Sequence, residues 1–123
     1  MSAMVIAVFA GGAAGSVARF VLSGWVYARF GTAFPWGTLT VNVTGSFLLG
    51  LAIPSFTATG SSPLPGFLLI GCFGAFTTFS TFSIEALILL RDGRRLTAAI
   101  YVAVSLIAGL LSVALGIGVG TLI

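Results

Sequence analysis

Four long apolar runs make up most of the sequence, and short polar or charged segments separate them. Each run reaches the length of about 20 apolar residues that a helix needs to span a bilayer. The pattern therefore predicts four membrane-spanning helices, over residues 4–27, 36–56, 66–90 and 96–123. Because a helix satisfies its backbone hydrogen bonds within one apolar segment, the expected fold is an all-α membrane protein.

The segments between the runs have the composition of loops and turns. Residues 28–35 end in Pro35, directly before Trp36, so a helix break and an interfacial aromatic mark the start of the second span. Residues 57–65, TATGSSPLP, form a polar loop, and residues 91–95, RDGRR, form a short charged turn. No basic residue precedes the first run, and no small-residue cleavage site follows it, so we expect a retained span and not a signal peptide.

Composition supports a lipid environment for the whole chain. Of its 123 residues, 59% are hydrophobic and 6% are charged, whereas globular domains have about 25% charged residues. The length holds four spans and no further domain of about 50 residues or more. We therefore expect residues 1–123 to form a single membrane domain.

The side chains present exclude most enzymes. The sequence has no His, no Lys, one Cys (Cys72) and two carboxylates, Glu85 and Asp92. It cannot form a Ser-His-Asp triad, a His/Cys zinc site or a phosphate-binding loop with its Lys, so we expect no enzyme. The net charge of +3 comes from arginines near the ends of the runs, and no basic stripe with aromatic residues indicates nucleic-acid binding.

Polar residues inside the runs carry the functional information, because each is costly to place in lipid. Arg19 lies well inside the first run. It either extends its side chain to the nearer interface or forms the positive mouth of an anion route. Asn42 shares one helical face with Thr38 and Ser46, and these groups either join helices by hydrogen bonds or line a pore.

The third run has the densest polar pattern. On an uninterrupted helix, a polar arc of about 160° would contain Thr77, Thr78, Ser80, Thr81 and Glu85. Phe79 and Phe82 would stand together beside this arc. Glycine and paired threonines favour a local break near residues 74–78, which persists in lipid only where protein or water covers it.

Hydroxyl groups beside phenylalanine rings suit an anion. A Phe ring has a positive edge, and hydroxyl and amide hydrogens can replace the hydration shell of an anion. Two carboxylates are too few for a cation route. The pattern therefore favours an anion pore over a bundle interface joined by Ser and Thr.

Three motifs lie in the first three runs. They are Gly11-Gly12-x-x-Gly15-x-x-x-Arg19, Trp36-Gly37-Thr38-Leu39-x-Val41-Asn42-x-x-Gly45-Ser46-Phe47 and Gly71-x-x-Gly74-x-x-Thr77-Thr78-Phe79-Ser80-Thr81-Phe82-Ser83-x-Glu85. In order and spacing the sequence resembles the Fluc/CrcB family of fluoride channels, which are small four-span proteins that export fluoride from microbes. The resemblance covers nearly the whole chain, and Ala75 departs from a second glycine of the family.

The resemblance implies an antiparallel, dual-topology dimer with two fluoride pathways in the cytoplasmic membrane of a bacterium. In each pathway, it implies, Phe79 and Phe82 would be the pair of rings along the pore. Asn42 would be the amide donor near them, and Arg19 the cation of the vestibule. The further polar groups that it implies along the pathway are those of Ser80, Thr81, Glu85 and Tyr101.

The resemblance also implies a structural sodium ion at the centre of the dimer. The backbone carbonyls of Gly74 and Thr77, two from each subunit, would hold it. Four carbonyl oxygens without a charged side chain suit a hard, weakly demanding cation better than a transition metal.

Two other functions remain open from the sequence. A small multidrug transporter shares the four spans, the length and the dual topology, but it needs a carboxylate in its first span, where this sequence has Arg19. A structural membrane subunit or assembly factor would conduct no ion.

The arginines are unevenly distributed along the chain. With four alternating spans, one side holds Arg29, Arg91, Arg94 and Arg95, while the 57–65 loop on the other side holds no Arg or Lys. Basic residues in short loops favour the cytoplasm, so the chain should prefer one orientation. An antiparallel dimer then needs either a homodimer that tolerates this bias or a paralogous subunit of opposite bias.

Overall fold

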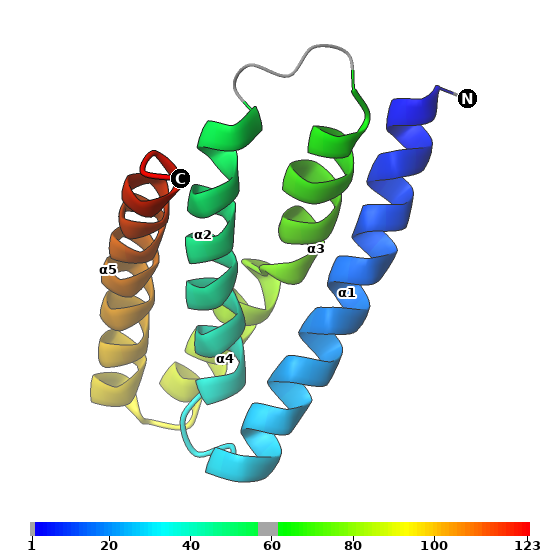
Figure 1. Ribbon diagram of the computed structural model, residues 1–123. Helices are drawn as coiled ribbons and strands as arrows, with labels where there is room; N and C mark the ends of the chain where they lie inside the picture. Colours follow the sequence, from blue (N-terminus) through cyan, green and yellow to red (C-terminus); the bar gives the residue numbers. More distant parts are fainter. Residues whose placement is uncertain (1, 57–61) are drawn as a thin grey trace.

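The computed structural model describes residues 2–56 and 62–123 as helices with short connections (Figure 1). The helices are α1 (Ala3–Phe30), α2 (Trp36–Phe56), η1 (Gly66–Phe73), α3 (Gly74–Phe76), α4 (Ser80–Arg91) and α5 (Arg95–Gly120). Four segments are long and apolar enough to cross a bilayer: α1, α2, the run from η1 to α4, and α5. The predicted all-α fold with four spans is confirmed. Of the predicted 57–65 loop, residues 57–61 lie outside the described residues.

The spans lie side by side, with α2 between α5 and the segment of η1 and α3, and with α1 beyond that segment (Figure 1). α2 packs most extensively against α5, and α1 packs most extensively against η1. The start of α1 and the end of α5 lie at one end of the bundle, and the α1–α2 and α4–α5 connections lie at the other. This second end, which we call the arginine end, carries Arg29, Arg91, Arg94 and Arg95.

Specific side-chain contacts and two glycines shape the connections at the arginine end. Arg94 donates a hydrogen bond to the carbonyl oxygen of Ala33 and so links the two connections. The guanidinium of Arg29 lies 5.8 Å from the ring centroid of Trp25, within the range of a cation–π contact. Gly31 and Gly93, with φ of 81° and 77°, adopt the left-handed conformation that ends α1 and α4 without strain.

The third span is broken near its middle. The π-helix η1 continues into α3, and Thr77 then has extended backbone, with φ −80° and ψ 159°. Helix α4 begins at Ser80. The break predicted near residues 74–78 is confirmed, but its non-helical part covers residues 77–79. The prediction of one continuous polar arc is therefore wrong, because Thr77 and Thr78 lie in the break and not on a helical face.

Glycines bring the backbones of neighbouring spans into close contact. A Cβ atom at Gly11 would lie 2.1 Å from the carbonyl oxygen of Phe67, and one at Gly15 would lie 2.1 Å from that of Cys72. At Gly116 the nearest backbone oxygen of α2 would be 2.2 Å away. Apolar burial gives little attraction between helices in lipid, so such backbone packing holds the bundle together.

Replacing Gly15 by Ala should destabilise the protein, because the new methyl group would collide with the backbone of η1. We expect the free energy of unfolding to fall by about 1–3 kcal/mol, the usual cost of overpacking. The matched control is Gly24→Ala, on the same helix, where a Cβ atom has no neighbour within 4 Å. The measurement is the temperature at which the detergent-solubilised protein aggregates, and equal temperatures for the two variants would contradict the packing role.

Candidate functional site

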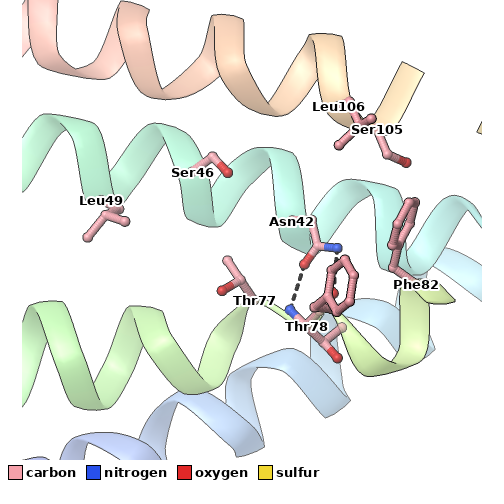
Figure 2. Close-up of a pocket in the computed structure, with 9 residues that line it drawn as sticks. Asn42, Ser46, Leu49, Thr77, Thr78, Phe82, Ser105 and Leu106 are labelled. Atoms are coloured by element: carbon pink, nitrogen blue, oxygen red, sulfur yellow. Dashed lines mark hydrogen bonds between the residues drawn. The ribbon is translucent and has the colours of Figure 1, made fainter. Parts of the chain in front are cut away.

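Asn42 on α2 holds the break in the third span. Its Nδ2 atom donates to the carbonyl oxygen of Thr78 at 2.9 Å, and the N–H of Thr78 donates to Oδ1 of Asn42 at 2.7 Å (Figure 2). These bonds satisfy backbone groups that have left the helical ladder, as a break within lipid requires. Asn42 therefore joins two spans, which is one of the two roles that the sequence left open.

A cavity of about 270 Å³, the phenylalanine cavity, lies beside this pair. Its lining comes from α2, α4, α5 and the break (Figure 2). Phe79 and Phe82 line it with ring centroids 5.8 Å apart, so the predicted pairing of the two rings is confirmed. Asn42, Ser46 and Ser105 add polar groups to the same lining.

The two rings of the pair have different surroundings. Phe82 lies 5.2 Å from Tyr101 on α5, measured between ring centroids. Tyr101 is fully buried and meets the ring of Phe34 edge to face. Phe79 is 78% exposed. One ring is thus anchored inside the bundle, and the other stands on its outer surface.

A second cavity, of about 370 Å³, lies between α1, α2 and α4, and we call it the Arg19 cavity. The Nη1 atom of Arg19 donates to the carbonyl oxygen of Thr77 at 3.4 Å. Its side chain therefore turns toward the break and not toward the nearer interface. Thr78 lines both cavities, so they adjoin at the break.

Three hydroxyl groups surround the carboxylate of Glu85 in the Arg19 cavity. Its Oε1 atom accepts hydrogen bonds from Tyr27 at 2.9 Å and from Thr38 at 2.8 Å. Its Oε2 atom accepts one from Tyr101 at 2.9 Å. The donors come from α1, α2 and α5, so the carboxylate on α4 connects all the long helices. A carboxylate in an apolar bundle needs such donors, because its desolvation is costly.

Ser80 and Thr81 begin α4 beside Thr78. Oγ1 of Thr78 lies 3.2 Å from Oγ1 of Thr81 and 3.4 Å from Oγ of Ser80. The N–H of Thr81 also donates to the Thr78 hydroxyl, at 3.3 Å. Glu85 follows one helical turn later, so these groups form a polar line from the break toward the arginine end. Most candidate residues from the sequence thus line one of the two adjoining cavities, whereas Ser80, Tyr101 and Gly74 line neither.

The two residues whose carbonyls the resemblance assigns to sodium lie at the break. Gly74 begins α3, and Thr77 follows its last residue. No three His, Cys, Asp or Glu side chains among residues 2–56 and 62–123 come together in a way that could hold a metal ion. A cation at this place would therefore depend on backbone oxygens, which suit hard cations.

The site also contains two residues that the sequence did not single out. Within the described chain, Oγ of Ser105 is buried in the phenylalanine cavity without a hydrogen-bond partner. Its place four residues after Tyr101, on the same helical face, could have indicated it. Tyr27 lies at the predicted end of the first span, where tyrosine is common for interfacial reasons, so no sequence signal separates it from an ordinary anchor.

Comparison with known proteins leads to the same family as the three motifs. The family model for CrcB-like protein, Camphor Resistance (CrcB), matches residues 6–117. The Fluoride-specific ion channel FluC of Magnetococcus marinus is 50% identical over 115 residues, which are 92% of this chain and 94% of the relative.

Two further relatives carry the same name, Fluoride-specific ion channel FluC. The protein of Hydrogenovibrio crunogenus is 48% identical over 120 residues, 94% of this chain and 89% of the relative. That of Rhizobium meliloti is 45% identical over 115 residues, 92% of each chain. Ion channels are not enzymes, so these relatives agree with the exclusion of enzymes from composition. The resemblance seen in the motifs is confirmed, and the chain belongs to the CrcB-like protein family.

Proposed function

We propose that the protein is a passive, fluoride-selective channel that exports fluoride across the cytoplasmic membrane and so reduces fluoride toxicity. The observation that carries the proposal is the pair of Phe79 and Phe82 beside the Asn42 amide, in one cavity of a membrane-spanning bundle. Relatives that match nearly the whole chain are named fluoride-specific ion channels, which supports fluoride as the ion.

The phenylalanine cavity offers an anion several donors without a full positive charge. The edges of the Phe rings are positive. The Nδ2 atom of Asn42 uses one of its two hydrogens for the carbonyl oxygen of Thr78, so the other can bind an anion. The hydroxyl of Ser105 is a further donor beside the rings. These groups would replace the water that fluoride loses on entry.

From this cavity the ion would follow the hydroxyl groups of α4 toward the arginine end. Ser80 and Thr81 would receive it first, and the hydroxyl of Tyr101 and the carboxylate of Glu85 lie further along. Arg19, on the opposite wall, would attract anions into the polar line by its charge. Each residue of the line has a hydrogen-bonding group, so the ion need not cross an apolar step.

A second subunit in antiparallel orientation would complete the route. The 12 residues of α4 extend about 18 Å, little more than half of a hydrocarbon core of about 30 Å. The other half of the third span, η1, has the sequence GFLLIGCF, without hydroxyl, amide or charged side chains. An inverted partner would supply polar groups at that depth and would cover the exposed ring of Phe79. Two such routes would follow from the two-fold symmetry of a homodimer, or from the approximate symmetry of a pair with a paralogous subunit.

The same pairing would bring the breaks of the two subunits together. Gly74 and Thr77 of each subunit would then provide four carbonyl oxygens, and we propose that these hold a structural sodium ion. The extended backbone at Thr77 supports this proposal, because it interrupts the helical ladder that otherwise uses the carbonyl groups. The Thr77 oxygen also accepts from Arg19, so its second lone pair would face the ion.

The small multidrug transporter is not favoured, because α1 carries Arg19 and no carboxylate that could exchange protons. A purely structural subunit gives no reason for two adjoining cavities lined by Arg19, Asn42 and the phenylalanine pair.

Phe79→Ile and Phe82→Ile should each lower fluoride efflux by about tenfold or more, which corresponds to about 1.4 kcal/mol in the barrier. Isoleucine keeps much of the apolar volume but lacks a positive ring edge. Efflux is measured from proteoliposomes with a fluoride electrode. The control is Phe9→Ile, because Phe9 lies on α1 outside both cavities and is 73% exposed. Unchanged efflux in both test variants would contradict the role of the rings, and no efflux from the unmodified protein would contradict the channel.

Replacing sodium by N-methyl-D-glucamine on both sides of the membrane should suppress fluoride efflux or dissociate the dimer. A bound structural ion stabilises the state that binds it, by mass action, so its removal favours the separated subunits. Efflux and the mass of the detergent-solubilised protein are measured before and after the exchange, and restored sodium serves as the control. If both stay unchanged while elemental analysis shows the ion to be absent, the proposed sodium site is refuted.

Fusion of the C-terminus to paired reporters tests the orientation. We expect strong activity of alkaline phosphatase, which works outside the cytoplasm, and weak fluorescence of a cytoplasmic reporter, since the arginine end should stay inside. A variant with Arg91→Ala and Arg95→Ala should shift activity toward the cytoplasmic reporter. Comparable activity from both reporters in the unmodified chain would indicate dual topology and would exclude a fixed orientation with a paralogous subunit.

A further inference from the structure

Tyr27 lies at the boundary between the Arg19 cavity and a third cavity at the arginine end. This end cavity, of about 240 Å³, is lined by residues that include Thr32, Asp92 and Arg94. Tyr27 and Glu85 line both cavities, and the two linings share no other residue. These two side chains therefore lie where the two cavities meet.

Hydrogen bonds hold Tyr27 at this boundary. Its hydroxyl donates to Oε1 of Glu85 at 2.9 Å and accepts from the N–H of Thr38 at 3.4 Å. The single hydrogen of the hydroxyl is thus used by a carboxylate on α4, and its oxygen by a backbone donor on α2. The side chain cannot swing away from the boundary without breaking both bonds.

Packing holds the ring in the same place. A Cβ atom at Gly37 would lie 2.4 Å from Cε2 of Tyr27, so the ring rests against the backbone of α2. Tyr101 also donates to Glu85, but it is fully buried and lines neither cavity. The two tyrosines therefore share a hydrogen-bond partner and differ in their position relative to the cavities.

We infer that Tyr27 is the barrier between the Arg19 cavity and the end cavity, held closed by its hydrogen bond to Glu85. The inference rests on the proposed function, because the barrier lies where fluoride would leave the hydroxyls of α4 for the arginine end. Arg19 and Arg94, which attract anions, line the cavities on opposite sides of it. Asp92 also lines the end cavity, and movement of the one ring would connect the two cavities.

The test measures access of a thiol reagent and not ion flux. In a Cys72→Ser background, Ser23→Cys reports on the Arg19 cavity and Thr32→Cys reports on the end cavity. The full-length protein in lipid vesicles is treated with 2-sulfonatoethyl methanethiosulfonate, an anionic reagent that does not cross the bilayer. Mass spectrometry then gives the rate of labelling at each reporter.

With Tyr27 present, we expect slow labelling of the Ser23→Cys reporter and fast labelling of the Thr32→Cys reporter. Tyr27→Phe removes only the hydroxyl and should raise the Ser23→Cys rate about tenfold, the factor expected for one hydrogen bond to a charged group. Tyr27→Ala removes the ring and should raise the rate further. Tyr101→Phe, the matched control, removes the same group from the same carboxylate and should leave the rate unchanged.

Equal Ser23→Cys rates with and without the Tyr27 substitutions, alongside fast labelling at the Thr32→Cys reporter, would overturn the inference. An equal rise in Tyr101→Phe would also overturn it, because the whole cluster at Glu85 would then form the barrier. Neither result bears on whether fluoride permeates, since efflux measures that separately.

Discussion

The pair of hydrogen bonds between Asn42 and Thr78 is the interaction on which the rest of the site depends. Burying a backbone N–H or C=O group in hydrocarbon without a hydrogen-bond partner costs on the order of several kcal/mol of free energy. The break at residues 77–79 removes such groups from the helical ladder, and one amide side chain supplies both an acceptor and a donor to Thr78. Only because this residue is satisfied can the third span change direction inside the bundle.

Close packing supports the break from the same helix. Gly45 lies three residues after Asn42, and a Cβ atom there would lie 2.4 Å from Cγ2 of Thr77. Helix α2 therefore provides a hydrogen-bond partner for the break at Asn42 and, one turn later, space for the side chain of Thr77 at Gly45. On the other side, Gly11 and Gly15 let α1 approach η1 until their backbones touch. Gly45 thus leaves room for the break, and Gly11 and Gly15 fix the half of the span that precedes it.

The elements that depend on local composition could be predicted from the sequence, and those that depend on distant contacts could not. Hydropathy is sufficient to predict the four spans, because each must cross the same thickness of lipid. Glycine and threonine indicated a break near residues 74–78, but its place depends on Asn42, which lies far away in the sequence. A helical wheel therefore misplaced Thr77 and Thr78, although it correctly paired Phe79 with Phe82.

The polar groups of the site show the same division. Glu85 and the hydroxyls of α4 stood out because polar residues are rare in the apolar runs. Tyr27 did not, because its role depends on the angle at which α1 crosses α2 and on the space left by Gly37. For Ser105, the only sequence signal is its spacing from Tyr101. That its hydroxyl is buried without a hydrogen-bond partner can be recognised only from the structure around it.

The short reach of α4 has an electrical consequence. A potential of 100 mV is worth about 2.3 kcal/mol to one elementary charge that crosses the whole membrane. The polar line on the 12 residues of α4 covers about 18 Å of a core of about 30 Å, so about 1.4 kcal/mol would act on an ion within one subunit. That energy changes a rate about tenfold. In a homodimer, an inverted second copy would present the same line in the opposite direction. At equal fluoride concentrations, equal and opposite voltages would then drive currents of equal size, so the channel would not rectify.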